Sequence, residues 1–176
     1  MTIEAERRAN EAALDVYRSR LDTIPDVQFE LTPPGGGWSY SEVYHHILQA
    51  TLGSTMALEK CTLSICAPTT KRSSLIGLFV LTFDRFPPVK VKVPAIMTER
   101  NPVKKISKED ARNLIIKCRK RITDVTPLIH DSAINKRMKH PRMGMLNASQ
   151  WFKFILIHLE HHIKQLNRVE RKFPPK

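Results

Sequence analysis

The sequence predicts an all-α protein, a four-helix bundle in which a long loop and a short helix separate the second long helix from the third. Three capping signatures each precede a stretch with apolar residues at helical spacing: Ser39 with Glu42, Ser107 with Asp110, and Asn147 with Gln150. Helix-forming residues also prevail near the N-terminus. A chain of 176 residues is long enough to bury a core, so we expect one domain over residues 1–176.

The first helix is expected over residues 3–22, before Pro25. Its modest apolar stripe consists of Ala13, Val16, Tyr17 and Leu21. The Pro-Pro-Gly-Gly-Gly run at 33–37 opposes the continuation of any regular element. This run therefore separates the first helix from the second.

The second helix is expected to begin at Ser39 and to continue to about Cys61. After it, residues 73–86 form an apolar stretch that suits a short helix, while residues 87–102 contain too many prolines for a long one. The alternating Val-Lys pattern at 89–93 is typical of a strand, but a strand here has no evident partner. We therefore expect an extended loop packed over the bundle.

The third and last helices have the clearest patterns. Apolar residues recur at three- and four-residue spacing from Ser107 until Pro127; they are Ala111, Leu114, Ile115, Cys118, Ile122 and Val125. The last helix begins at the Asn147 cap and continues towards the prolines at 174 and 175.

The composition limits the classes of partner and the compartment. A formal net charge of +12 makes anionic partners conceivable, but the basic residues are scattered without a nucleic-acid-binding motif, so a solvated basic surface is favoured over nucleic acid binding. The N-terminus lacks the features of a signal peptide, and three cysteines are too few for a disulfide framework. No apolar run is long enough to span a bilayer. We expect a cytoplasmic protein without a membrane partner.

Two histidines of the last helix share its inward face. His158 and His162 are separated by about 40 degrees around the helix, and Gln165 lies close to both in rotation. His161 lies between this face and the solvated face. Leu159 follows His158, so the zincin motif His-Glu-x-x-His is absent. The pair suits a divalent metal, although core histidines held by a hydrogen bond give the same spacing.

A third ligand must come from another helix. His45 and His46 project about 100 degrees apart in the second helix, so only one of them can readily face a given site. His46 shares its stripe with Val43 and Ala50, which favours His46. His130 and His140 lie in expected loops and are weak candidates.

The motifs assembled so far resemble those of the DinB-like (YfiT-like) four-helix-bundle superfamily. The first is Trp-Ser-x-x-Glu-x-x-x-His, formed by Trp38, Ser39, Glu42 and His46. The second is His-Pro-x-x-Gly followed by Trp and His-x-x-His-His-x-x-Gln, formed by His140, Pro141, Gly144, Trp151, His158, His161, His162 and Gln165. The resemblance implies a metal triad of His46, His158 and His162, and it makes a homodimer plausible.

Members of that superfamily include thiol-dependent transferases and proteins described as metal-dependent hydrolases. Our leading hypothesis is a transferase or hydrolase that acts on a small molecule, such as a low-molecular-weight thiol, through a divalent zinc, nickel or iron ion. His161 or Gln165 would orient a ligand or the substrate from outside the coordination sphere. The alternatives are a basic protein that binds a polyanion without catalysis and a degenerate bundle that lacks metal.

Overall fold

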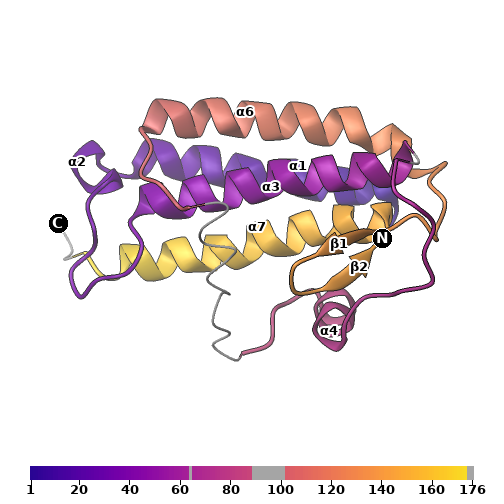
Figure 1. The fold of residues 1–176 in the computed structure, drawn as a ribbon. Coiled ribbons are helices and arrows are strands. Elements are labelled where there is room, and N and C mark those ends of the chain that lie inside the picture. Colours follow the sequence, from indigo (N-terminus) through magenta and orange to yellow (C-terminus); the bar gives the residue numbers. More distant parts are fainter. Residues whose placement is uncertain (64, 89–101, 174–176) are drawn as a thin grey trace.

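Four long helices dominate the computed structural model, which describes residues 1–63, 65–88 and 102–173 (Figure 1). They are α1 (Ile3–Thr23), α3 (Tyr40–Thr62), α6 (Lys108–Val125) and α7 (Ala148–Glu170). The shorter elements are α2 (Asp26–Phe29), α4 (Leu75–Phe83), the 3-10 helix η1 (Thr126–Ile129) and the strands β1 (Met138–His140) and β2 (Gly144–Leu146). The predicted all-α class and four-helix bundle are confirmed, with a short helix between the second and third long helices.

Reciprocal caps explain where three of the long helices begin. The Ser39 hydroxyl accepts the N–H of Glu42 at 3.2 Å, and the Glu42 carboxylate accepts the N–H of Ser39 at 2.9 Å. The same exchange links Ser107 with Asp110 and Asn147 with Gln150. All three caps agree with the sequence prediction, because capping depends only on residues three positions apart.

The long helices form a ring in the order α1, α6, α3, α7, so that each packs against two neighbours (Figure 1). Neighbours α1 and α6 are antiparallel, as are α3 and α7, whereas α3 runs parallel to α6 and α1 runs parallel to α7. Two contacts fix the direction of each antiparallel pair: Asp22–Arg112 and Asp15–Arg119 for α1 and α6, and His46–His162 and Cys61–Leu146 for α3 and α7. For the parallel pairs they are Leu48–Cys118 and Glu59–Arg121 for α3 and α6, and Tyr17–Leu159 with Glu6 near Lys153 for α1 and α7. Parallel neighbours need a long crossover, which residues 63–107 supply.

Two fully buried tyrosines join three of these helices through the core. The Tyr44 hydroxyl on α3 donates to the carbonyl oxygen of Tyr17 on α1, and the Tyr17 hydroxyl donates to the carbonyl oxygen of Leu159 on α7, both at 2.8 Å. Their rings meet edge to face with centroids 5.4 Å apart. Burial raises the pKa of both phenols, so both remain hydrogen-bond donors. These bonds hold α3 and α7 in register.

The loop predicted around His140 contains a two-stranded antiparallel hairpin, which corrects that prediction. The His140 Nδ1 atom accepts the N–H groups of Arg142 and Met143 at 3.2 and 3.1 Å, closing the turn. Gly144 has a positive φ of 80°, and a Cβ there would lie 2.5 Å from the backbone nitrogen of Ser74. Strands of three residues are too short to show a period, which is why the sequence pattern missed them.

Two further predictions concern the connection and the membrane. The Val-Lys alternation at 89–93, expected as an extended loop, lies outside the described residues. Across the parts of the chain that the structure describes, every helix is too short or too polar to cross a bilayer.

Candidate metal centre

Three imidazoles from two antiparallel helices converge in the bundle. His46 is on α3, and His158 and His162 are one turn apart on α7. One ligand atom from each ring lies within 4.8 Å of the other two. The Nε2 atoms of His158 and His162 are 3.0 Å apart, and the His46 ring centroid lies 4.8 Å from that of His162. The sequence prediction that these three meet is therefore matched by the geometry, while their role as metal ligands stays a prediction.

Aromatic side chains surround this cluster. Trp38, next to the α3 cap, lies with its ring centroid 5.1 Å from that of His46. Phe154, one turn earlier in α7, stacks on His158 with ring centroids 5.1 Å apart. The ring centroid of Phe86 lies 5.9 Å from that of His158. These rings remove water from the imidazoles and leave few competing hydrogen bonds. A ligand that enters here therefore meets a nitrogen-rich site that is partly shielded from water.

Gln165 fixes the orientation of one ring. The Nδ1 atom of His162 and the Oε1 atom of Gln165 are 2.6 Å apart, one turn along α7. With the amide oxygen as acceptor, Nδ1 carries the proton and the lone pair of His162 lies on Nε2, which faces His158. His158 then donates its Nε2 proton to His162. If His158 and His162 hold a metal ion, each would present the lone pair of Nε2 to it, and His158 would carry its proton on Nδ1.

The electrostatics keep the three rings neutral. Burial, reinforced by the neighbouring histidines, lowers the pKa of His46 to about 4 and lowers the pKa of His158 and His162 well below the usual range. Within the described residues, no carboxylate forms a hydrogen bond or an ion pair with these imidazoles. Neutral imidazole with a free lone pair is the form that binds a metal ion.

The distances fit a divalent ion after a small adjustment. Tetrahedral zinc with bonds of about 2.0–2.1 Å to nitrogen sets its nitrogen ligands roughly 3.4 Å apart. The distance of 3.0 Å between the Nε2 atoms of His158 and His162 is slightly shorter than this. The upper limit of 4.8 Å on the distances among the three ligand atoms is longer. A shared ion would therefore require the rings to shift from their positions in this structure. Three protein ligands leave further coordination positions for water or substrate.

The two residues predicted to act from outside the coordination sphere have different positions. Gln165 contacts His162 directly. His161 is half-buried, its ring centroid lies 5.1 Å from that of His162, and it packs against Phe86 at 4.7 Å. Burial lowers its pKa, so His161 is a neutral imidazole beside the triad rather than part of it.

The remaining histidines lie elsewhere. The Nδ1 atom of His45 accepts the N–H of Lys104 at 3.2 Å on the side of α3 that faces α6. His130 is exposed after η1. His140 is half-buried against Trp151 and Phe154, where desolvation lowers its pKa to about 4, and its Nδ1 atom closes the hairpin turn.

Two aromatic neighbours of the triad, Phe154 and Phe86, were not predicted from the sequence. Phe154 precedes His158 by four residues, so the helical period that paired His158 with His162 also predicts Phe154 on the same face. Phe86 follows α4 in irregular backbone and has no periodic signal. Its position beside His158 and His161 depends on how the crossover packs.

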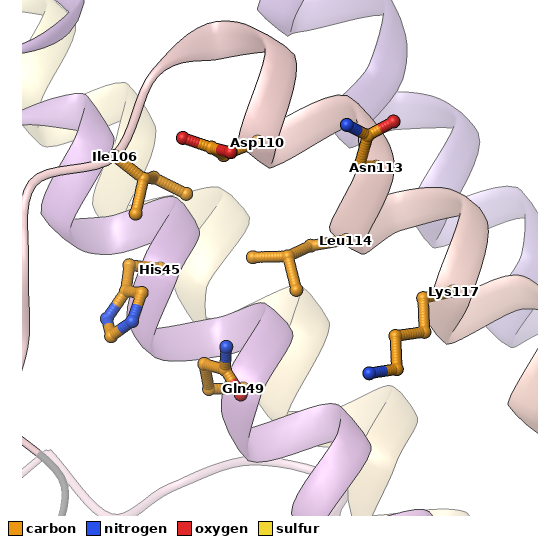
Figure 2. Close-up of a pocket in the computed structure, with 7 residues that line it drawn as sticks. All are labelled: His45, Gln49, Ile106, Asp110, Asn113, Leu114 and Lys117. Atoms are coloured by element: carbon orange, nitrogen blue, oxygen red, sulfur yellow. The ribbon is translucent and has the colours of Figure 1, made fainter.

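A separate polar groove of about 320 Å³ lies between α3 and α6 (Figure 2). Figure 2 shows Leu114 of α6 pointing towards α3, with His45 and Gln49 on the α3 side of the groove and Asn113 and Lys117 on the α6 side. In the ring of helices, α7 packs on another side of α3. The groove is therefore distinct from the histidine triad.

Comparisons with known proteins agree with this fold. No curated protein sequence matches the chain. YfiT from Bacillus subtilis, described as a probable metal-dependent hydrolase with an unusual four-helix bundle topology, superposes with a TM-score of 0.64 at 14% identity, covering 96% of this chain and 86% of that one. TT2238, described as a four-helix bundle protein, gives a TM-score of 0.60 at 14% identity, covering 95% and 99%. At such identity these likenesses show the fold alone. The family model of the DinB superfamily matches residues 9–166, and the chain belongs to that superfamily.

Proposed function

We propose that this protein is a divalent-metal-dependent enzyme that acts on a small molecule, with His46, His158 and His162 as the metal ligands. The observation that carries the proposal is the convergence of three neutral imidazoles within 4.8 Å, that of His162 buried and those of His46 and His158 half-buried, without a carboxylate partner among the described residues. Zinc, nickel and iron all accept such a nitrogen set. Hydrolysis is the favoured reaction class, because the fold neighbour YfiT carries that description.

The bound ion would supply Lewis acidity and lower the pKa of a water molecule or thiol that coordinates to it. The chain provides the remaining functions. Gln165 holds the His162 ring in the tautomer that presents Nε2. Trp38, Phe86 and Phe154 line the site with aromatic rings and would limit the access of water to it. His161, neutral and adjacent to His162, would accept a proton from the attacking group or orient the substrate.

Transfer to or from a low-molecular-weight thiol is the second reaction class. A set of three imidazoles adds no negative charge to the ion, so an anionic thiolate is attracted to the remaining coordination positions. Hydrolysis and thiol transfer therefore share the same site and differ in the nucleophile. Assays with and without added thiol distinguish them.

The polyanion-binding alternative has less support. On α6, five basic side chains form salt bridges with acidic residues of α1, α2, α3 or α6 itself; they are Lys108, Arg112, Arg119, Lys120 and Arg121. This helix is therefore not an open basic stripe of the kind that follows a phosphate backbone. Polyanion binding would weaken steeply with salt and would be unaffected by chelators.

The test is metal content measured by elemental mass spectrometry on tag-free protein, beside the triple variant His46→Ala/His158→Ala/His162→Ala. We expect near-stoichiometric metal in the parent protein and loss of metal in the triple variant. A His161→Gln variant should keep its metal and lose turnover in the hydrolysis or thiol-transfer assay. A parent protein that stays free of metal after reconstitution with zinc, nickel and iron would refute the proposal.

A further inference from the structure

The short helix α4 presents an apolar face to solvent. Leu75 is 87% exposed, Leu78 and Phe83 are each 57% exposed, and Ile76 is 40% exposed. With about 100 degrees per residue, these side chains and Phe79 share one broad arc, in which Thr82 is the polar member. Phe79 packs on Phe83 with ring centroids 4.8 Å apart. A cluster of large exposed apolar residues on one helix marks an interaction surface.

Close packing on the other side of α4 keeps this face outward. Gly77 and Val80 are the buried residues of the helix. A Cβ at Gly77 would lie 2.2 Å from the carbonyl oxygen of Met143, so the helix lies directly against the hairpin turn. The Ser74 hydroxyl, which caps α4, also donates to the carbonyl oxygen of Arg142 at 2.9 Å. The helix therefore has little freedom to turn its apolar face into the bundle.

Basic residues flank this apolar face. The two segments that form the region, residues 65–88 and 133–147, contain one acidic residue, Asp84, which pairs with Lys153 at 2.7 Å. The basic residues of the same segments are Lys71, Arg72, Arg85, Lys136, Arg137, Lys139 and Arg142. Lys71, Arg72 and Arg85 are exposed and lie at the two ends of α4. Figure 1 shows α4 beside the hairpin, on one side of the bundle.

We propose that α4 docks this protein on the surface of an anionic membrane, with Leu75, Leu78 and Phe83 inserted among the lipids and Lys71, Arg72 and Arg85 contacting the headgroups. Exposed apolar residues with flanking basic residues are the pattern of interfacial helices. A second copy of the chain is a poorer occupant, because it would bring the same basic residues together. Docking at the surface differs from spanning the bilayer, which none of the described helices can do. It departs from the expectation of a protein without a membrane partner, and it goes beyond the proposed enzymatic function.

The experiment is co-sedimentation of the metal-loaded protein with vesicles of phosphatidylcholine alone and with vesicles of mixed phosphatidylcholine and phosphatidylglycerol. We expect binding to the mixed vesicles that weakens with added salt. Leu75→Ser/Leu78→Ser should lower the partition coefficient about tenfold or more. Lys71→Gln/Arg72→Gln should lower it about fivefold for each charge removed. Val27→Ser, which alters an 84% exposed valine on α2, is the matched control and should bind like the parent.

Circular dichroism and metal content of each variant verify that the bundle is intact. Absence of binding to the mixed vesicles would overturn the proposal, and so would a Leu75→Ser/Leu78→Ser variant that sediments like the parent. Equal binding to neutral and mixed vesicles would overturn the assignment of an anionic membrane. Light scattering of lipid-free protein tests the other occupant. A dimer that becomes monomeric in Leu75→Ser/Leu78→Ser, with no vesicle binding, would assign the face to a second copy.

Discussion

Substitution of Gln165 tests whether the hydrogen bond to His162 tunes metal binding. In the structure, the Gln165 Oε1 atom lies 2.6 Å from the Nδ1 atom of His162, on the side of the ring opposite His158. Gln165→Ala removes this acceptor without changing a ligand. The His162 ring then loses the bond that selects its tautomer, and part of the binding free energy of the metal must be used to orient it.

The expected size follows from similar outer-sphere bonds, whose loss weakens metal binding about tenfold to a hundredfold. This corresponds to about 1.4–2.8 kcal/mol of binding free energy. Gln165→Glu should act in the opposite direction, because a carboxylate is a stronger acceptor for the Nδ1 proton than an amide is. The order of affinity should therefore be Glu, then Gln, then Ala at position 165.

The assay is a competition titration of the metal-free protein with zinc against a chromogenic chelator, at fixed pH and ionic strength. Lys164→Ala is the matched control, since Lys164 is an exposed neighbour on the same helix. It should bind zinc like the parent. Thermal unfolding of each metal-free variant separates a loss of affinity from a loss of fold. An affinity of Gln165→Ala equal to that of the parent would refute the orienting role of this residue.

Three further predictions concern stability and are measured by urea unfolding of metal-free protein. Burial lowers the pKa of His46 and of His140 to about 4 from an ordinary value of 6.5, so as the pH falls the unfolded chain is protonated at these histidines before the folded protein is. The free energy of unfolding should therefore be greatest above pH 6.5 and should fall towards pH 4 by about 1.4 kcal/mol per pH unit for each histidine. A free energy of unfolding that does not change over this range would contradict the prediction. Gly144→Ala should destabilise the protein by about 2 kcal/mol or more, because φ is positive there and the added Cβ clashes with backbone atoms. Gly53→Ala should stabilise it by about 0.5–1 kcal/mol, because Gly53 lies in the middle of α3 with open space around it. Stability changes of the same sign in both variants would refute this reasoning. Tyr44→Phe should cost about 1–2 kcal/mol because it removes a buried hydrogen bond between α3 and α1, and an unchanged midpoint would argue against that bond.

The helices could be predicted from the sequence because their signals are local. The caps at Ser39, Ser107 and Asn147 each depend on one residue three positions later, and the structure contains all three. The convergence of His158 with His162 follows from the helical period alone. The choice of His46 over His45 used the apolar stripe of α3, and the structure places His45 on the side facing α6.

The remaining features depend on contacts between distant segments. The hairpin is closed by the His140 imidazole and by Gly144, whose close approach to Ser74 requires the crossover chain to lie beside it. Phe86 reaches the histidines from irregular backbone. The order of the helices around the ring has no local signature either. Sequence patterns show which face of a helix is apolar, but not which other helix covers it.

The order of the helices around the ring has a consequence for how the chain folds. Helices that follow one another with the shortest connections, α1 with α3 and α6 with α7, lie on the diagonals of the ring rather than side by side. Neither pair can therefore collapse early as a self-contained helical hairpin, as happens in an up-down-up-down bundle. The contacts of α7 with α1 and α3 join the two ends of the chain, which gives a high contact order and predicts slow folding for an all-α protein. During synthesis, the nascent chain can close its core and bring the histidines together only after α7 has left the ribosome.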